Sequence, residues 1–543
     1  MKNFSFVNRI QNINKMKAQE FDLVVIGGGI NGAGVARDAA ARGMSVALIE
    51  ARDFASGTSS KSSKLIHGGI RYLENMEFKL VFEALNERTR LFEMAPHLVH
   101  PLRFMIPLYK DSRVGMFKMG LGMWLYDALS LFQAPEMHER LNAKESLNRM
   151  PAIRSTDLLG SYIYSDAYMD DDRLVHETMR SANELGAVCA NYVKATGAEF
   201  SEGKITALTC EDQISKEKFA IKARHVISSV GPWTDTLGET LLKDWKKILR
   251  PTKGIHLTLP KHRLPLSSAV VMAAEKSDRI VFGIPRHEMI IIGTTDTDFK
   301  EAPENVTATP EDVRYLLSIT DHYFPGAAIT AHDVIASYAG VRPLVKDESA
   351  TEGKTSREHT IIHDPRGITF VAGGKYTTYR LMCEQTVTRA LESFSLEERV
   401  KFAKKDTAVP LNEYTSVDAF NQAQSLSDAW AQETGRPLAE IRLLTERYGL
   451  EAQEILHKYP EKYTYWQLEA AQAIDATMCL HMSDFYARRV PLFLADRNHG
   501  VKHLEEIGRV FQEKLGWNDA KLKDEMHKLT EYMAHEVEWK KHF

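Results

Sequence analysis

Two short apolar runs flank an alanine-rich stretch between positions 21 and 50 of the chain. Residues 21–26 read FDLVVI, a largely apolar and β-branched run that predicts a strand buried on both faces. The alanine-rich residues 31–42 predict a helix that packs closely on a sheet, and residues 44–50, MSVALIE, predict a second strand. The chain is therefore predicted to begin with a strand–helix–strand unit.

Further strands are predicted where β-branched runs alternate with polar turns, after a helix at residues 171–185. They cover residues 225–230, 254–259, 279–284, 289–293 and 367–372, and a GGK turn then leads into a predicted helix at 377–391. From Ser416 onward helical periodicity dominates and glycine is rare, which predicts a separate helical domain. Its charged helices, including Arg488 and Arg489, are expected to form a solvated or dimer-forming face.

The composition is typical of a cytosolic globular protein and argues against several other classes. The chain has 543 residues, of which 44% are hydrophobic and 26% charged, enough for several domains with large cores. A net charge of -4 gives no general attraction to nucleic acid. Four cysteines without a CxxC pair argue against a zinc site or a disulfide framework and suit a reducing compartment. No metal site is predicted.

Residues 1–19 carry four basic residues but no apolar core of signal-peptide length, so a secretory signal is rejected. We expect a disordered leader, or a start of translation that really lies at Met16. A basic tether to an anionic membrane surface is the alternative.

A spanning helix is not expected, because no run of about 20 apolar residues without charge occurs. The nearest candidate is residues 116–132, MFKMGLGMWLYDALSLF, interrupted by Lys118 and Asp127. This stretch predicts either a buried or interface helix, or an apolar surface that rests on lipid with Trp124 and Tyr126 at headgroup level.

A glycine-rich turn follows the first predicted strand. Gly27, Gly29 and Gly32 form GxGxxG, and Glu50 ends the second strand. The first glycine allows a tight turn, the second admits a pyrophosphate, and the third lets the helix pack on the strand. The helix N-terminus then offers N–H groups to phosphate, and the acid accepts ribose hydroxyls. The unit predicts a dinucleotide site.

The continuation favours FAD over NAD. Residues 58–73 read TSSKSSKLIHGGIRYL, rich in hydroxyls, with two lysines, His67 and two glycines. A flavin needs such a second strip of donors and close backbone along its pyrophosphate, ribityl chain and ring.

These segments together resemble the FAD-dependent, quinone-linked glycerol-3-phosphate dehydrogenases, in a flavoprotein superfamily that also holds D-amino-acid oxidase. The similar motifs are FDLVVIGGGINGAGVARDAAARG, GTSSKSSKLIHGGIRYLE, ISSVGPWTD, IIGTTDTDF, YAGVRPL and VAGGKYTTYR, in the family's order. The likeness spans roughly residues 20–400, and SDFYARRVPLFL resembles the family's helical C-terminal segment. Residues 405–480 match only weakly.

The resemblance implies an α/β fold: a doubly wound Rossmann-type FAD domain interleaved with an antiparallel-sheet substrate domain, plus an all-helical C-terminal domain. It assigns residues 20–95, 165–235 and 335–400 to the FAD domain, 96–164 and 236–334 to the substrate (cap) domain, and 405–543 to the helical domain. The implied flavin contacts are Gly27, Gly29, Gly32, Glu50, Ser59, Lys64, Leu65, His67, Val193, Gly231 and Gly374.

The family's substrate is a dianionic phosphate ester, which needs converging cations. Arginine suits phosphate because its planar fork donates two parallel hydrogen bonds. We assign Arg342 and Lys375 mainly to the phosphate and Arg71 to the substrate's oxygens. His256 is the candidate base or hydroxyl orienter, since a histidine titrates near neutral pH; a core histidine is the alternative. Hydroxyl hydrogen bonds are assigned to Thr377 and Thr378.

The implied reaction is oxidation of sn-glycerol 3-phosphate to dihydroxyacetone phosphate, with hydride transfer to FAD and electrons passed to a membrane quinone. The implied location is the cytoplasm, in peripheral contact with lipid at the inner face of the cell membrane, with a homodimer possible. An oxidase that uses dioxygen and a non-catalytic flavin-binding scaffold are the alternatives. An amine oxidase is disfavoured, because two arginines and a lysine exceed what one carboxylate requires.

Overall fold

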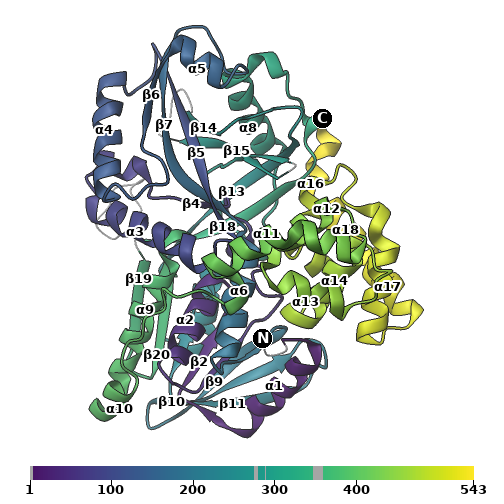
Figure 1. Ribbon diagram of the computed structural model, residues 1–543. Coiled ribbons are helices and arrows are strands. Elements are labelled where there is room, and N and C mark those ends of the chain that lie inside the picture. Colours follow the sequence, from purple (N-terminus) through teal and green to yellow (C-terminus); the bar gives the residue numbers. More distant parts are fainter. Residues whose placement is uncertain (1–3, 274–278, 288, 347–358) are drawn as a thin grey trace.

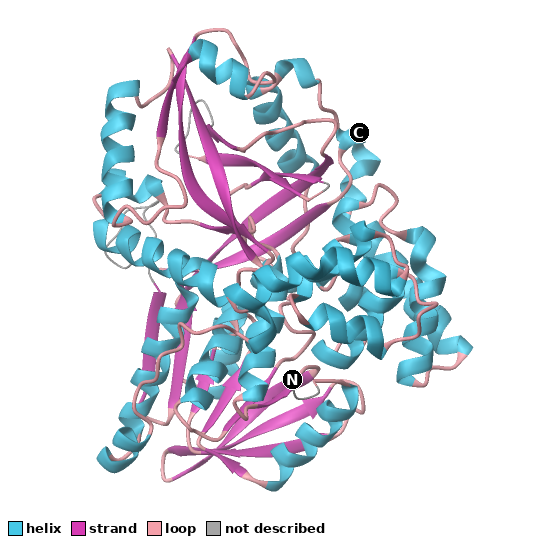
Figure 2. Ribbon diagram, in the orientation of Figure 1, coloured by secondary structure: helices cyan, strands magenta, loops and turns pink. Residues whose placement is uncertain are grey.

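A computed structural model of the chain describes residues 4–273, 279–287, 289–346 and 359–543. Figure 1 shows three parts: a large sheet with flanking helices, a unit with two smaller sheets below it, and the C-terminal helices at one side. Figure 2 separates the large sheet of the upper half from the strands of the lower half.

The six-stranded sheet of the lower unit has the order β19-β20-β12-β2-β3-β8 and is parallel except for β19. Its strands are β2 (Leu23–Ile26), β3 (Val46–Ile49), β8 (Val188–Ala190), β12 (Val226–Ser228), β19 (His359–Asp364) and β20 (Ile368–Gly373). Helix α2 (Ile30–Ala41) packs between α6 (Asp171–Glu184) and α9 (Tyr379–Ala390). All four residues of β2 and of β3 are buried, as expected for parallel strands covered by helices.

The predicted strand at residues 21–26 divides at Asp22. β1 (Glu20–Phe21) joins β11 (Lys218–Ala223) in a second, four-stranded sheet, whereas β2 stays in the six-stranded sheet. The other two strands of this second sheet are β9 (Val193–Ser201) and β10 (Lys204–Asp212). The Asp22 carboxylate accepts hydrogen bonds from the backbone N–H and the hydroxyl of Ser45, which fixes the chain where it passes between the sheets.

The prediction of a disordered leader is wrong for the described residues 4–19. Residues Phe6–Ala18 form helix α1, whose N-terminus is capped by the Ser5 side chain. Arg9 is 1% exposed, and its guanidinium lies 2.5 Å from the Asp212 carboxylate. Because Arg9 is buried in an ion pair with a residue some 200 positions away, the N-terminal segment is part of the fold. Residues 1–3 lie outside the described residues.

The large sheet has ten strands: eight follow the order β17-β13-β16-β15-β14-β5-β7-β4, while β18 pairs with β13 and β6 pairs with β7. They are β4 (Leu65–Ile66), β5 (Val99–Tyr109), β6 (Glu139–Asn142), β7 (Leu158–Met169), β13 (Leu249–Pro260), β14 (Ala269–Ala273), β15 (Ile280–Arg286), β16 (Met289–Gly293), β17 (Thr297–Asp298) and β18 (Ser337–Val345). Because β18 pairs with β13, residues 337–345 join this sheet and not the flavin-type sheet to which they were assigned.

Two helices pack against different strands of the large sheet. α4 (Met116–Leu129) contacts β7 and α3 (Phe78–Met94), whereas α8 (Pro310–Tyr323) contacts β13, β14 and β16. In the part of the chain that the structure describes, no helix has both the length and the apolarity needed to cross a bilayer.

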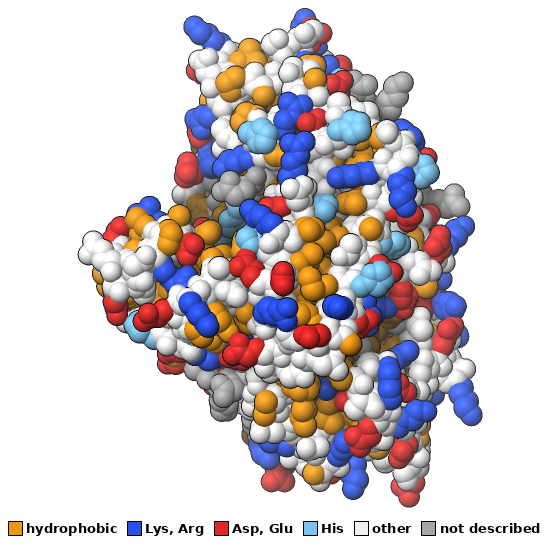
Figure 3. Space-filling model, turned by 90° about the vertical axis from the view of Figure 1, so that its right-hand side faces the viewer, with side chains coloured by type: hydrophobic (Ala, Val, Ile, Leu, Met, Phe, Trp, Pro, Cys, Tyr) orange, Lys and Arg blue, Asp and Glu red, His pale blue; other side chains and the backbone are white. Residues whose placement is uncertain are grey.

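Eight helices, connected by short turns, dominate the C-terminal part. They are α11 (Val417–Thr434), α12 (Leu438–Tyr448), α13 (Glu451–Lys458), α14 (Tyr465–Thr477), α15 (Met482–Arg488), α16 (Leu492–Ala495), α17 (Leu504–Leu515) and α18 (Asp519–Glu536). Acidic and basic side chains are interspersed over the face of the molecule shown in Figure 3, so neither sign dominates there.

Arg488 and Arg489 do not form a solvated face, contrary to the prediction. Arg488 Nε lies 2.6 Å from Asp53 Oδ2, and Arg489 donates to both Asp53 oxygens, at 2.7 and 2.8 Å. Asp53 is 1% exposed. Burial raises the pKa of Asp53, but Arg489 and Arg488 more than offset it and hold that pKa below its ordinary value. The cluster fastens the C-terminal helices to the loop after β3.

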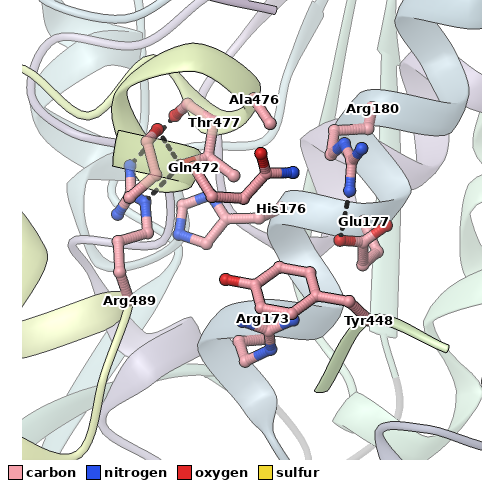
Figure 4. Close-up of a pocket in the computed structure, with 10 residues that line it drawn as sticks. Arg173, His176, Glu177, Arg180, Tyr448, Gln472, Ala476, Thr477 and Arg489 are labelled. Atoms are coloured by element: carbon pink, nitrogen blue, oxygen red, sulfur yellow. Dashed lines mark hydrogen bonds and ion pairs between the residues drawn. The ribbon is translucent and has the colours of Figure 1, made fainter. Parts of the chain in front are cut away.

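A small cavity lies between α6 and the C-terminal helices (Figure 4). Its lining includes Arg173, His176, Arg180, Tyr448, Gln472 and Arg489. Burial, followed by the charge of Arg489, lowers the pKa of His176 well below its ordinary value, so this histidine is neutral. The cavity belongs to the domain junction and contains none of the predicted site residues.

Candidate active site

The glycine-rich turn brings the start of α2 against the end of β2. Gly27 has φ +109°, and a Cβ on Gly32 would lie 1.8 Å from the Gly27 carbonyl oxygen. Gly29 is the N-cap of α2, and Ser59 Oγ accepts a hydrogen bond from the Ile30 N–H at 3.0 Å. The turn thus offers a helix N-terminus and bare backbone, the surface that a dinucleotide pyrophosphate requires. These residues fit the FAD that the sequence implies.

Glu50 follows the end of β3 and lies beside this turn. One carboxylate oxygen accepts the Gly28 N–H at 2.7 Å and the other accepts the Arg52 N–H at 2.8 Å. Burial raises the pKa of Glu50, and both hydrogen bonds lower it. The Val193 N–H donates to the Glu50 carbonyl oxygen at 2.7 Å, so the predicted adenine and ribose neighbours adjoin each other.

Residues 58–73 contact the strands that carry the predicted substrate residues. Thr58 Oγ1 donates to the Val341 carbonyl oxygen at 2.7 Å, and the Tyr338 hydroxyl donates to the Ser62 carbonyl oxygen at 3.0 Å. Ser63 Oγ lies 2.8 Å from His256 Nε2. The segment therefore lies against both β18 and β13.

The same segment contacts the GGKYTTYR motif. Thr377 Oγ1 accepts the His67 N–H at 3.1 Å and lies 3.3 Å from the His67 carbonyl oxygen. Lys375 Nζ stands 3.5 Å from the centroid of the Tyr72 ring, a cation–π contact. Thr378 Oγ1 donates within its own turn, to the Lys375 carbonyl oxygen at 3.4 Å.

Three predicted flavin neighbours have a positive φ. Gly231 and Gly374 have φ +55° and +83°, which glycine adopts without strain. Lys64 has φ +55° as well, and its neighbour Leu65 opens β4.

The Lys64 side chain has a protein partner that the sequence did not predict. It is 1% exposed, and its ammonium pairs with the Asp171 carboxylate at the start of α6. Asp171 also accepts the Ser62 hydroxyl at 2.7 Å. The acidic run at 170–172 marks the start of the predicted helix, since such residues favour helix N-termini, but it gives no sign of the partner lysine.

His256 is 2% exposed and stacks on Tyr338, with ring centroids 4.7 Å apart and planes 13° apart. Its Nδ1 is buried and has no hydrogen-bond partner among the described residues. Burial, and then the charges of Arg342 and Lys64, lower the pKa of His256 well below its ordinary value. The ring is neutral. Its Nε2 hydrogen-bonds to Ser63, and its Nδ1 is available to hydrogen-bond a bound ligand.

Arg342 lies on the same face of the large sheet as His256. Its guanidinium nitrogen is 2.3 Å from where a Cβ on Gly254 would stand, and Gly254 is two residues from His256 on β13. Arg342 donates to Thr294 Oγ1 at 2.9 Å and to the Thr295 carbonyl oxygen at 3.1 Å, with Asp296 Oδ1 at 3.3 Å. The bare Gly254 leaves room for the arginine beside the histidine.

Arg71 lies in the 3₁₀ helix at Ile70–Asn75 that follows the two glycines of HGG. It is exposed, and within the described ranges it has no hydrogen-bond or ion-pair partner. The structure thus brings His256 and Arg342 together on the large sheet, and Lys375, His67 and Thr377 together beside Tyr72. Both groups adjoin residues 58–73.

Two family models match the chain. The model described as FAD dependent oxidoreductase covers residues 22–380, and the C-terminal domain of alpha-glycerophosphate oxidase covers residues 417–522. The aerobic glycerol-3-phosphate dehydrogenase of Staphylococcus saprophyticus is 34% identical over 530 residues, 95% of this chain and 94% of that protein. The enzyme of the same name from Bacillus subtilis is 33% identical over 95% of each chain.

Solved structures agree with these matches. The glycerol-3-phosphate dehydrogenase from Bacillus halodurans, complexed with FAD, superposes with a TM-score of 0.82 at 28% identity and 98% coverage of both chains. The L-alpha-glycerophosphate oxidase from Mycoplasma pneumoniae shares the fold, with a TM-score of 0.54 at 17% identity over 68% of this chain and 95% of the other.

The predicted fold class, an α/β FAD domain with an antiparallel-sheet domain and a helical C-terminal domain, is confirmed. So are the FAD cofactor and the enzymatic nature of the protein. The chain belongs to the family of FAD-dependent oxidoreductases and, within it, to the aerobic glycerol-3-phosphate dehydrogenases.

Proposed function

We propose that this enzyme oxidises sn-glycerol 3-phosphate to dihydroxyacetone phosphate and delivers the electrons to a membrane quinone. The observation that carries the proposal is the position of Arg342 beside His256, on a sheet face that adjoins residues 58–73. That segment also contacts the glycine-rich turn, where Ser59 Oγ accepts the Ile30 N–H at the start of α2. An anion-binding cation and a neutral imidazole therefore lie next to the cofactor cradle.

The glycine-rich turn and Glu50 would hold FAD, with pyrophosphate at the N-terminus of α2 and the ribose hydroxyls on the Glu50 carboxylate. When bound, FAD supplies the hydride acceptor, and the protein supplies orientation and electrostatics.

Arg342 and Lys375 would bind the substrate phosphate, and Arg71 would bind its oxygens. Arg342 approaches from the large sheet and Lys375 from the turn after β20. Cations from separate elements suit a dianion, because each adds a charge-assisted hydrogen bond in a different direction. The Lys375 ammonium stands over the Tyr72 ring, which sets its position beside residues 67–72.

His256 would orient the hydroxyl at carbon 2 and take its proton. A neutral ring can accept a proton, and burial keeps this ring neutral. Ser63 at 2.8 Å from Nε2 fixes the plane of the ring together with the Tyr338 stack. The buried Nδ1 is the atom that remains for the substrate.

The exposed apolar face of α4 supports contact with lipid, where a quinone dissolves. Phe117, Leu121 and Trp124 are 82%, 59% and 61% exposed. Leu131 and Phe132, just after the helix, are 54% and 58% exposed. A run of large apolar side chains with this exposure is typical of a surface that binds a membrane or a partner. We place this face on the inner surface of the cell membrane.

Anaerobic addition of glycerol 3-phosphate to the purified holoenzyme tests the substrate assignment. Bleaching of the flavin absorbance is expected, and no bleaching would refute it. Aerated turnover then tests the acceptor: a soluble quinone analogue should be reduced with little peroxide, whereas stoichiometric peroxide would favour an oxidase.

Co-sedimentation with anionic phospholipid vesicles tests the lipid contact. Phe117→Ser with Trp124→Ser should reduce the bound fraction severalfold. Leu396→Ser is the matched control, since Leu396 is 77% exposed on a different helix, α10 (Leu396–Lys401). Equal binding of all three proteins would exclude the α4 face.

A further inference from the structure

The backbone N–H of Gly68, in the HGG turn, is held by a buried polar trio. The Tyr126 hydroxyl lies 3.0 Å from the Gly68 nitrogen and donates to the Asp166 carboxylate at 2.8 Å. Asp166 Oδ1 lies 3.3 Å from the Gly68 nitrogen and accepts Arg88 NH1 at 2.6 Å. Tyr126 comes from α4, Asp166 from β7 and Arg88 from α3.

The trio is fully enclosed. Tyr126, Asp166 and Arg88 are 2%, 1% and 0% exposed. Burial, and then the nearby Asp166 charge, raise the pKa of Tyr126 well above its ordinary value, so the hydroxyl keeps its proton and donates. Buried ion pairs contribute little to stability, because desolvation of the two charges offsets their attraction. We therefore consider the trio for the backbone position that it fixes at Gly68, and not for its contribution to stability.

Gly68 has no room for displacement toward the trio. A Cβ on Gly68 would lie 2.5 Å from the Tyr126 oxygen and 2.5 Å from Leu85 Cδ2. On the preceding residue, the His67 N–H donates to Thr377 Oγ1, which lies in the turn after β20. The next residue, Gly69, has φ +76°, so the chain turns sharply there. The two hydroxyls fix the backbone just before Arg71 and Tyr72.

We propose that Tyr126, oriented by Asp166 and Arg88, is a positioning residue of the substrate site: it sets the path of residues 67–72 and so the places of Arg71 and of Lys375 on Tyr72. The inference rests on the proposed assignment of Arg71 and Lys375 to glycerol 3-phosphate. Tyr126 itself acts through the Gly68 backbone and touches no substrate.

Tyr126→Phe tests this assignment, because it keeps the ring and removes only the hydroxyl. The KM for glycerol 3-phosphate should rise roughly tenfold, as expected for the loss of one hydrogen bond of about 1.4 kcal/mol. The kcat should change less than about threefold, and the FAD content should match the wild type. A structural defect alone would lower the yield of active holoenzyme without this split between KM and kcat.

Tyr164→Phe is the matched control. Tyr164 is 4% exposed on β7, its ring lies 5.6 Å from that of Tyr126, and its hydroxyl has no hydrogen-bond partner in the described chain. Its KM should equal that of the wild type. A Tyr126→Phe enzyme with wild-type KM would overturn the proposal, as would equal KM increases in both variants.

If Tyr126→Phe fails to fold, Arg88→Lys provides the decision. This variant keeps a positive charge beside Asp166 but loses the guanidinium that holds the carboxylate at 2.6 Å, so it should raise KM in the same direction. Normal KM in Arg88→Lys, or loss of FAD in both variants, would assign the trio to stability alone. Absence of flavin bleaching in the wild type would instead refute the proposed function and leave the KM comparison without a substrate.

Discussion

Replacement of Arg342 by alanine is the sharpest perturbation of the proposed phosphate site. The side chain is 26% exposed, and its terminal nitrogens donate to Thr294 Oγ1 and the Thr295 carbonyl oxygen. Asp296, at 3.3 Å, competes for one side of the guanidinium. The contacts hold the arginine over Gly254 beside His256, so a phosphate there would be within its reach.

The expected size of the effect follows from the kind of bond that is lost. A hydrogen bond to a charged group contributes about 1.5–3 kcal/mol, which corresponds to a factor of roughly 10 to 150 in affinity. Partial exposure and the competition of Asp296 favour the lower half of this range. We therefore expect the KM for glycerol 3-phosphate to rise roughly 10- to 40-fold in Arg342→Ala. Arg342→Lys keeps the positive charge but loses the planar guanidinium, so its KM should lie between those of the wild type and Arg342→Ala.

Dye-linked steady-state kinetics and anaerobic flavin reduction over a range of substrate concentrations would measure this change. FAD content should be normal, because the glycine-rich turn and Glu50 belong to the other sheet. Arg263→Ala is the control: Arg263 lies beyond the far end of β13, where it pairs with Asp333 at 2.6 Å. An unchanged KM in Arg342→Ala with full FAD occupancy would remove Arg342 from the phosphate site.

Three further predictions concern the base, the domain junction and pH. His256→Ala should depress kcat across pH 6–8 alike, since burial holds its pKa well below that range; normal turnover with reduced yield would make it a core histidine. Asp53→Asn should lower the free energy of unfolding by about 3–5 kcal/mol in urea titrations, because it leaves Arg488 and Arg489 without their buried partner, and a loss under 1 kcal/mol would contradict the role of the cluster. The pKa of His176 is lowered by burial, so the unfolded chain binds a proton below about pH 6.5 while the folded protein does not, and stability falls as pH falls. Between pH 7.5 and 5.5 this histidine should account for up to about 1.4 kcal/mol of that loss, the limit set by an unfolded pKa of about 6.5, and His176→Gln should remove it from the pH profile of the urea midpoint; an unaltered profile would show that His176 is not titrated in this way.

Sequence reasoning succeeded where function depends on residues close together in the chain. The spacing of Gly27, Gly29 and Gly32 predicts a turn because each glycine is required by a contact within that turn, such as the 1.8 Å approach at Gly32. The helix that follows the turn was placed within one residue of its observed start and end, because hydrophobic periodicity and flanking glycines mark helix limits.

The errors arose where a residue's partner is distant in sequence. Arg9 looked like part of a basic leader, but its carboxylate partner is Asp212, so its burial has no local signature. Arg489 looked exposed for the same reason, with Asp53 436 positions away. In the candidate site, the motifs predicted which residues take part, whereas the Ser63–His256 and Lys64–Asp171 contacts depend on how segments distant in sequence pack together.

The buried pairs of Asp53 with Arg488 and Arg489 hold the C-terminal helices against the flavin-binding unit. The exposed turn at residues 403–406 is open to proteases, but a cut there would not separate the two pieces. Release of the C-terminal piece would break the pairs of Asp53 with Arg488 and Arg489 and expose the apolar surfaces that are buried between the two pieces. The two pieces must therefore melt in one transition, and a nicked enzyme should migrate as an intact molecule until it is denatured.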